Sequence, residues 1–454
     1  MADAANQQAD RHPPGVAVLS GTEMAERFSY YGMMALLMLY MNKQLLMPGH
    51  AENVMGLAGL RHFFEFRGAM SDQAFASLIN GWYGGLVYFT PMIGGWIADR
   101  WLGTKRTVVL GLVLMMAGHV AMSFDQSFLL ALTLLIAGSG CLKGNVAAQV
   151  GMLYPTAEES RRARGYAIFS TGINVGAVAG PLAAGSMAQA YGWHAGFALA
   201  AGLMLVALIV YLGGQRFLPD TAAAKVARAE FPPLTSDEKR RTWLLVLVIL
   251  LNIPGDMAYS MIWSIGVLWI DQKVNLATSL GLVPASWFNS LDSFGSIIVV
   301  TPLVALWARQ ARRGTEPDSL AKIGIGSIIV GCSALLMMVG SLIAGENKVS
   351  AFWPIAAFLG MGLAFMWYWP VTLALVSQSA PPKIAATLVS VVYLTSFFGS
   401  VVMGWIGTFY SEMSNASFWA LDGAIPLVGA VVIFTLRPAL KRGLTPQSGL
   451  IIPK

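Results

Sequence analysis

Long apolar runs recur along nearly the whole chain and are separated by short polar segments. A run of about 20 apolar residues is long enough to cross a bilayer core of about 30 Å as a helix. These runs lack the alternation of apolar and polar positions that a membrane β-barrel requires. The pattern therefore predicts an all-α integral membrane protein with twelve transmembrane helices. The expected spans are residues 18–46, 71–98, 104–123, 127–153, 163–190, 194–214, 242–270, 284–308, 320–344, 350–379, 382–411 and 416–438.

The composition of the 454 residues agrees with this prediction. The chain is 56% hydrophobic and only 11% charged, and its mean hydropathy is +0.62. Ordinary soluble domains carry about 25% charged residues. Cys141 and Cys332 both lie inside expected spans, so they provide neither a disulfide framework nor the ligand spacing of a metal site. We expect no metal, and packing roles for both cysteines.

Lysine and arginine are distributed unevenly between the two sides of the expected membrane protein. They concentrate in the termini and in the loops after the even-numbered spans. The loops on the other side hold five: Lys43, Arg61, Arg67, Lys273 and Lys348. By the positive-inside rule both termini face the cytoplasm. This bias explains the net charge of +6, which therefore gives no indication of nucleic-acid binding. The N-terminus lacks the features of a cleaved signal, so the first helix is expected to be retained.

The longest polar interruption between spans runs from Gly213 to Arg241 and divides them into six and six. We therefore expect an N-terminal half (1–214), a cytoplasmic linker (215–241) and a C-terminal half (242–454). Transporters with this layout place their site between the halves, near the bilayer midplane. The loop sequence "GGWIADRWLGTKR", Gly94 to Arg106, resembles the loop motif of the major facilitator superfamily and favours the same architecture.

Three charges lie in the first expected span. Glu23, Glu26, Arg27 and Tyr30 are spaced i, i+3, i+4 and i+7, so they share one helix face. Each charge at the centre of a membrane helix costs about 3 kcal/mol on insertion scales. The charges are therefore expected to face partners or a watery cavity. The alternative is that they lie near the helix start and extend to the cytoplasmic interface.

The segment "EMAERFSYYG" resembles the helix 1 motif of the proton-coupled oligopeptide transporter family of the major facilitator superfamily. Further stretches resemble this family in the expected order: "VYFTPMIGGWIADR" with Tyr88, "GSGCLKGN" with Lys143, and "IFSTGINVGAVAGP" with Asn174. One departure is Ser170, where the family usually has an aromatic residue. The resemblance implies a proton-coupled importer of di- or tripeptides, or of related small zwitterions, that works by alternating access.

The resemblance also implies roles for individual residues. Arg27 and Lys143 would bind the substrate's carboxylate, which suits a guanidinium and an ammonium at low dielectric. Glu26, with Glu23 as a second candidate, would take and release the proton. Binding of the proton would weaken the attraction of Glu26 to Arg27 or Lys143. The residues expected to line the pocket are Tyr30, Tyr31, Tyr88 and Asn174.

The glycines close in sequence to Asn174 and Lys143 are expected to serve in helix packing. Gly172, Gly176 and Gly180 recur at four-residue spacing, which is typical of close contacts between membrane helices. We interpret Gly138, Gly140 and Gly144 beside Lys143 in the same way, because the order of a phosphate-binding loop is missing.

The second half departs from the family pattern at two acidic positions. The family's glutamate in span 10, which binds the peptide's amino group, corresponds here to Phe365. The family's acid in span 7, which pairs with the helix 1 arginine, corresponds to Ser260. Asp256 lies one turn earlier on the same face and is a candidate replacement in proton coupling. In the other interpretation, Asp256 caps a helix break after Pro254 and Gly255.

Asp292 stands in span 8 where the family often has an asparagine. Our hypothesis is that it replaces the missing glutamate as the partner of a substrate amine. Two alternatives are that Asp292 is a proton site, or that the substrate carries no such amine.

Other functions stay open at this point. A carrier of a non-peptide carboxylate would still use Arg27 and Lys143, and an exporter of drugs or metabolites is a further alternative. An enzyme would need a nucleophile with a base, or a metal cluster, at depth. Of the five histidines only His119 is clearly inside a span, and Asp125 is off helical spacing from it. We expect no enzyme and no cofactor other than protons as coupling ion, and a monomer in a bacterial inner membrane.

Overall fold

The computed structural model describes residues 12–155, 158–219, 233–279 and 281–444. Apart from one two-stranded antiparallel sheet, its regular structure is helical. In the first half the helices are α2 (Pro14–Tyr40), α3 (Leu57–Phe64), α4 (Asp72–Phe89), α5 (Pro91–Ile97), α6 (Gly103–Ala121), α7 (Phe128–Met152), α8 (Glu159–Tyr191) and α9 (Trp193–Gly214). In the second half the elements are α10 (Ser236–Ser260), α11 (Ile265–Lys273), β1 (Ala277–Thr278), β2 (Gly281–Leu282), α12 (Ser290–Arg312), α13 (Ser319–Ala344), α14 (Phe352–Ser379), α15 (Ala385–Ile406) and α16 (Asn415–Leu444).

Shorter helical turns extend or join these helices. Two are π-helical, Met41–Leu45 and Ala98–Leu102. The 3-10 turns are Ala51–Asn53, Glu65–Arg67, Asp125–Ser127, Gln215–Phe217, Met261–Trp263, Ala285–Asn289, Pro382–Ile384 and Gly407–Glu412. Together with the longer helices they follow the predicted spans closely.

Ten helical segments of the described residues are long and apolar enough to cross a membrane. One of them, Asp72–Ala121, contains two of the expected spans. The charged helix α2 is not among the ten, because its polar residues lower its hydropathy. The ten segments and α2 therefore account for all twelve expected spans, and the predicted fold class is confirmed.

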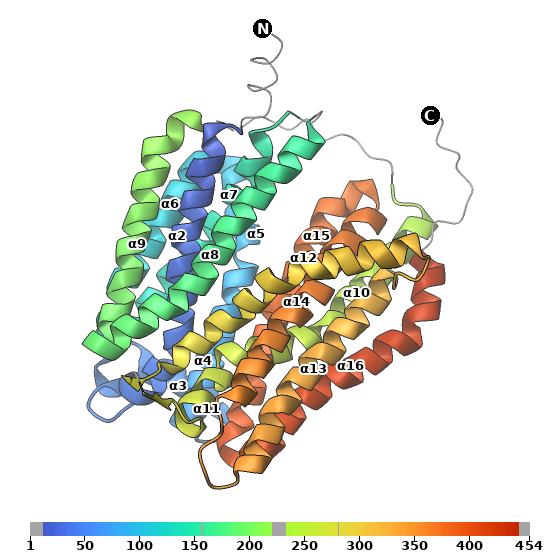
Figure 1. The fold of residues 1–454 in the computed structure, drawn as a ribbon. Coiled ribbons are helices and arrows are strands. Elements are labelled where there is room, and N and C mark those ends of the chain that lie inside the picture. Colours follow the sequence, from blue (N-terminus) through green and yellow to red (C-terminus); the bar gives the residue numbers. More distant parts are fainter. Residues whose placement is uncertain (1–11, 156–157, 220–232, 280, 445–454) are drawn as a thin grey trace, which may run out of the picture.

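The helices form two bundles in the order of the chain (Figure 1). In the first, α2 packs against α8 and α9, and in the second, α13 packs against α14 and α16. The bundles contact each other mainly through α4 with α15 and α8 with α12, and α2 also contacts α11. Part of the predicted linker (215–241) lies outside the described residues. After it, α10 begins with a capping box in which the Thr235 side chain accepts from the Glu238 amide.

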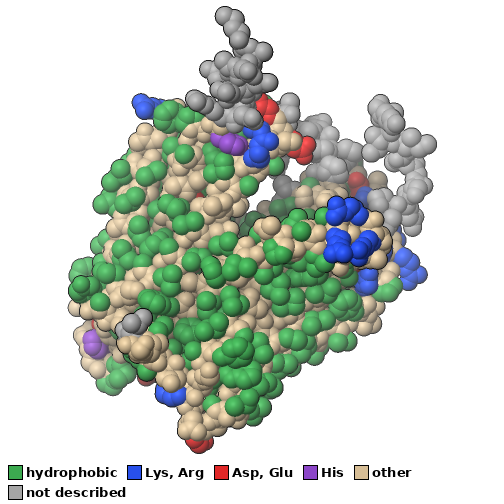
Figure 2. Space-filling model, in the orientation of Figure 1, with side chains coloured by type: hydrophobic (Ala, Val, Ile, Leu, Met, Phe, Trp, Pro, Cys, Tyr) green, Lys and Arg blue, Asp and Glu red, His purple; other side chains and the backbone are tan. Residues whose placement is uncertain are grey.

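The end of the molecule opposite the termini is closed by contacts between the two bundles. The Nζ atom of Lys43 lies 2.6 Å from the carboxylate of Asp271, and the Gln73 amide donates to the carbonyl of Gly407 at 2.9 Å. Figure 2 shows the surface hollowed between the bundles on the side where α2 begins and α16 ends. The structure therefore represents a state that is open on the terminus side.

The crossing of α4 and α15 is close because both helices carry glycine there. A Cβ atom added to Gly81 would lie 2.6 Å from the Cα atom of Gly404 and 2.7 Å from the carbonyl oxygen of Ser400. Real Cβ atoms do not approach other atoms this closely. Glycine at position 81 thus permits the contact that closes this end of the molecule.

The break in the seventh span comes later than Pro254 and Gly255, because α10 continues to Ser260. The interpretation that Asp256 caps a break at those two residues is therefore wrong. The break lies at Met261–Ser264, where two side-chain amides compensate the backbone. Asn80 of α4 donates to the carbonyl of Trp263 at 3.1 Å, and Asn289 donates to that of Ile262 at 3.0 Å.

Candidate functional site

The three charges of α2 lie inside the protein and contact one another. The exposed fractions of Glu23, Glu26 and Arg27 are 4%, 0% and 6%. The alternative that these side chains extend to the membrane interface is therefore wrong. The Nε atom of Arg27 lies 3.1 Å from a carboxylate oxygen of Glu23, and it also forms an ion pair with Glu26. Both acids are thus partners of the same guanidinium.

Lys143, on α7, reaches the same region from a second helix. Its Nζ atom lies 4.6 Å from the ring centroid of Tyr30 on α2 and 4.5 Å from that of Tyr88 on α4. Within the described part of the chain, this buried ammonium has no hydrogen-bond partner. The two tyrosine faces stabilise the charge through cation–π contacts, each worth about 0.5–2 kcal/mol.

The charges in this cluster balance formally: two carboxylates face one guanidinium and one ammonium. Arg27 contacts both acids, whereas the expected attraction between Glu26 and Lys143 is not formed as an ion pair among the described residues. A charge-assisted hydrogen bond contributes about 1.5–3 kcal/mol, more than a typical cation–π contact. The Lys143 ammonium would therefore gain by binding an anion.

Helix α8 packs tightly against α2 through the predicted glycines. A Cβ atom on Gly176 would lie 2.5 Å from the carbonyl oxygen of Met24, and one on Gly180 would lie 2.5 Å from that of Phe28. The predicted packing role of these glycines is confirmed. Asn174 lies between Gly172 and Gly176 in sequence and is partly exposed on the same helix.

Asp256 is buried among residues of the second half. Its Oδ1 atom lies 3.4 Å from the hydroxyl of Tyr368 on α14 and 3.4 Å from that of Ser396 on α15, and both hydroxyls donate to it. An ion pair between Asp256 and Arg27 is not among those found in the described residues. In this state Asp256 therefore contacts α14 and α15 instead of the α2 arginine.

Asp292 is also buried, with an exposed fraction of 2%. One of its carboxylate oxygens accepts a short hydrogen bond from the hydroxyl of Tyr259, and the other accepts from the Ser293 amide at 2.6 Å. The Tyr259 ring in turn stacks on Phe365, with ring centroids 5.5 Å apart and an interplanar angle of 30°. Phe365, at the position where an acid was expected, is thus connected to Asp292 through one tyrosine.

Two further aromatic residues of α14, Tyr368 and Trp369, contact this stack. They were not predicted from the sequence. The rings of Phe365 and Trp369 lie 6.1 Å apart at 17°, and Tyr368 contacts Phe365 at 5.9 Å. Their spacing of i, i+3 and i+4 in "FMWYWP" places them on one helix face, which is the signal that could have revealed them.

Tyr31 connects the two halves. Its ring lies 5.3 Å from that of Trp263, in the break of the seventh span. Tyr31 of the first half therefore contacts the break of the seventh span in the second half, a few residues after Tyr259 on α10.

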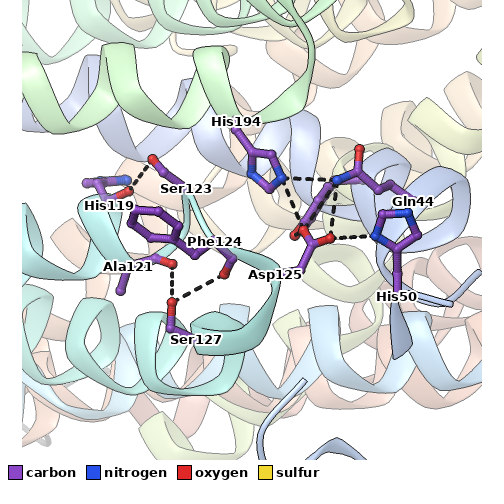
Figure 3. Close-up of polar contacts among 10 residues, drawn as sticks. Gln44, His50, His119, Ala121, Ser123, Phe124, Asp125, Ser127 and His194 are labelled. Carbon is purple, nitrogen blue, oxygen red and sulfur yellow. Dashed lines mark hydrogen bonds and ion pairs between the residues drawn. The ribbon is translucent and has the colours of Figure 1, made fainter. Parts of the chain in front are cut away.

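A second polar cluster lies in the first half, around Asp125 (Figure 3). Asp125 accepts from the hydroxyl of Tyr40 and contacts the rings of His50 at 2.6 Å and His194 at 3.1 Å. A pocket of about 320 Å³ adjoins these residues. The cluster connects the end of α2 with the start of α9 and the turn before α7. His119, the histidine inside a span, is not among the partners of Asp125 in the described part of the chain.

One buried acid in the last span was also missed. Asp422 on α16 is fully buried, and neither carboxylate oxygen has a hydrogen-bond partner among the described residues. The adjacent Gly423 packs on Gly331 of α13. Asp422 therefore lies between two peripheral helices and is not part of the cluster around Arg27. The sequence signal that could have revealed Asp422 is an acid within the apolar run "FWALDGAIP".

Comparison with known proteins identifies what the chain is similar to. Residues 24–404 match the family model described as Major Facilitator Superfamily. A Bacillus subtilis protein named Uncharacterized transporter YclF is 29% identical, with 95% of each chain covered. The Di-/tripeptide transporter of Lactococcus lactis subsp. cremoris is 28% identical, covering 94% of this chain and 96% of that protein.

A solved structure extends the similarity to the fold. The crystal structure of a peptide transporter POT (E310Q mutant) in complex with alafosfalin is 25% identical, with a TM-score of 0.83. The match covers 96% of this chain and 97% of that one. These matches confirm the resemblance predicted from the motifs in spans 1, 2, 4 and 5.

Proposed function

We propose that this chain, which belongs to the Major Facilitator Superfamily, imports di- or tripeptides or related small zwitterions together with protons. Transport, and not catalysis, is its activity. Import of peptides fits the findings better than export of drugs or metabolites, because the relatives named by substrate are peptide transporters. We further propose that it works as a monomer in the inner membrane of a bacterium.

The observation that carries this proposal is a buried cluster of two acids and two bases. Its members are Glu23, Glu26, Arg27 and Lys143. A proton on Glu26 removes one negative charge, so the cluster acquires a net positive charge. At low dielectric this excess charge strongly favours an anion. A substrate carboxylate at Arg27 and Lys143 then restores the balance, which couples substrate binding to protonation.

The remaining candidate residues complete the proposed site. Glu23, as the second acid on Arg27, is a further candidate for the proton, and Asp256 is one in the second half. Asp292 supplies the negative charge opposite the cation pair and attracts the substrate's amine. The proposed pocket-lining residues are Tyr30, Tyr31, Tyr88 and Asn174.

Alternating access follows from the closed and hollowed ends of the molecule (Figure 2). The basic loops and both termini are proposed to face the cytoplasm. In that orientation the structure is closed to the outside, and the site opens inward, where substrate and proton are released. Separation of α4 from α15 would then open the outer end.

A carrier of non-peptide carboxylates is the second candidate function. It is favoured by a single observation, the apolar Phe365 where an acid would bind an amine. Such a protein would retain the anion site at Arg27 and Lys143 but would not require an amine.

Uptake by purified protein in liposomes under an inward proton gradient separates the two functions. We expect radiolabelled dialanine to accumulate and to be competed by other small peptides. A panel of carboxylates without an amine should compete weakly. The peptide assignment would be overturned if such carboxylates are taken up, dialanine is not taken up, and peptides do not compete. That result would leave the fold unaffected.

Replacing Lys143 by glutamine is expected to weaken substrate binding at least about tenfold. The variant removes one of the two cations, and a charge-assisted hydrogen bond contributes about 1.5–3 kcal/mol. The dissociation constant for dialanine can be measured by titrating purified protein. The matched control is Lys239→Gln, at an exposed lysine near the start of α10. Unchanged affinity in the Lys143 variant would remove this residue from the site.

A further inference from the structure

We propose that the amine end of the substrate site is an aromatic surface with a carboxylate behind it, so that the transporter accepts substrates whose amine is methylated. This inference rests on the proposed function and names the class of substrate that the site admits. Such substrates are peptides or small zwitterions with a tertiary or quaternary ammonium group.

The aromatic surface consists of Tyr259, Phe365 and Trp369. The Tyr259 and Phe365 rings lie 5.5 Å apart at 30°, and the Phe365 and Trp369 rings lie 6.1 Å apart at 17°. The three rings thus form one nearly parallel row across α10 and α14. All three side chains are partly exposed, although many of their neighbours on these helices are buried.

The carboxylate of Asp292 is not available to an amine directly in this state. It is 2% exposed, and both of its oxygens already accept hydrogen bonds. One accepts from the Tyr259 hydroxyl, and the other accepts from the amide of Ser293 at 2.6 Å and from its hydroxyl at 3.2 Å. An incoming ammonium therefore meets the Tyr259 ring before it meets the carboxylate.

The hydrogen bond from Tyr259 to Asp292 changes the ring that the ammonium meets. A phenol that donates to a carboxylate gains electron density, and the face of its ring becomes more attractive to a cation. The negative charge of Asp292 thus acts on the substrate through Tyr259. Phe365 and Trp369 extend the same surface without adding a hydrogen-bond acceptor on their rings.

The position of this surface suits a zwitterion. Tyr31 follows Tyr30 on α2, beside Arg27, and its ring packs at 5.3 Å on Trp263, close to Tyr259 in sequence. Arg27 and Lys143 both lie over the ring of Tyr30, which contacts the Tyr31 ring at 5.1 Å. These contacts lead from the two cations to the second half, so a substrate with its carboxylate at Arg27 and Lys143 can place its cationic end toward the rings.

Methylation distinguishes an aromatic surface from a carboxylate. A primary ammonium has three donors and binds best where acceptors surround it. A trimethylated ammonium keeps the charge, loses every donor and adds apolar surface, and aromatic faces bind such cations well. Methylation should therefore be tolerated at the row of rings, whereas it would strongly weaken binding at an exposed carboxylate.

The test compares three ligands on the purified full-length protein. Dialanine, N,N,N-trimethyl-dialanine and N-acetyl-dialanine are titrated by intrinsic tryptophan fluorescence, and each is also tested as a competitor of dialanine uptake in liposomes. We expect the trimethylated compound to bind within about threefold of dialanine. The uncharged acetyl compound should bind at least about tenfold more weakly. Weakening of the trimethylated compound by more than tenfold would overturn the proposal.

Variants of Phe365 test whether the trimethylated ammonium binds at this row of rings. Phe365→Leu is expected to weaken binding of the trimethylated compound about five- to thirtyfold, whereas Phe365→Tyr should retain it. Phe365→Glu should create a preference for dialanine over the trimethylated compound. The control is Phe352→Leu, at an exposed position near the start of α14. An unchanged ratio of the two affinities in both the leucine and the glutamate variants would contradict the assignment.

Different results would overturn the proposed function and the aromatic amine site. Absence of dialanine uptake by the wild-type protein would overturn the proposed function, while the order of ligand affinities would still be measured by fluorescence. Normal uptake of dialanine with exclusion of the trimethylated compound would overturn only the aromatic amine site. Absence of binding by both cationic ligands would overturn both.

Discussion

Replacing Glu26 by glutamine is expected to reduce proton-driven uptake of dialanine at least about tenfold, while exchange of internal for external dialanine continues. Glu26 is fully buried and forms an ion pair with Arg27. Glutamine resembles the protonated acid in shape and charge, so the substrate site would stay in its proton-bound form. Exchange does not require a change in protonation, whereas net accumulation does.

The measurement compares net uptake and exchange in the same liposomes. Glu346→Gln, at an exposed position in the loop after α13, is the matched control and should behave like the wild-type protein. Glu23→Gln shows whether the second acid on Arg27 shares the role. If the Glu26 variant accumulates dialanine as well as the wild type under the same gradient, Glu26 does not carry the coupled proton.

Replacing Gly81 by alanine is expected to destabilise the state that is closed at the end opposite the termini. The added Cβ atom would lie 2.6 Å from backbone of Gly404, so α4 and α15 must separate. Overpacking of this kind costs about 1–3 kcal/mol, which shifts a two-state equilibrium by roughly 5- to 150-fold. Uptake should fall because the variant spends less time open on the terminus side.

Distances between spin labels at the end opposite the termini report this shift. Labels at Asn53 and Asn347, after Cys141 and Cys332 are replaced by serine, lie at exposed positions at that end of the first and second half. The Gly81 variant should show a larger population of long distances. Gly202→Ala is the control, because a Cβ atom there meets nothing within 4 Å. Equal distance distributions in variant and wild type would show that this crossing does not limit closure.

The twelve spans and the burial of the helix 1 charges inside the protein could be predicted from the sequence, because both follow from the cost of placing polar groups in a bilayer. The burial of Glu26 beside Arg27 follows from spacing along one helix. The packing of Gly176 against α2 was predictable for the same reason, since small residues at four-residue spacing form one stripe.

Contacts between helices far apart in sequence could not be predicted in this way. The position of Lys143 over Tyr30 and Tyr88 depends on how α7 meets α2 and α4. The sequence placed Asp256 on a helix face but did not indicate that the face points toward α14 and α15.

The break in the seventh span shows the same limit. Pro254 and Gly255 are strong local signals for a helix end, yet α10 continues past both. The chain breaks where Asn80 and Asn289, from other helices, supply hydrogen bonds to its carbonyls. Tertiary partners thus override the local propensity, and the signal lies in residues far away in the chain.

The central claim is that a proton and a zwitterionic substrate cross together through the cluster around Arg27. The most direct measurement uses liposomes containing a pH-sensitive dye, with no imposed proton gradient, to which dialanine is added outside. We expect acidification of the interior by the wild-type protein and none by the Glu26→Gln variant. Dialanine entry by the wild-type protein without acidification, or with alkalinisation of the interior, would contradict this claim.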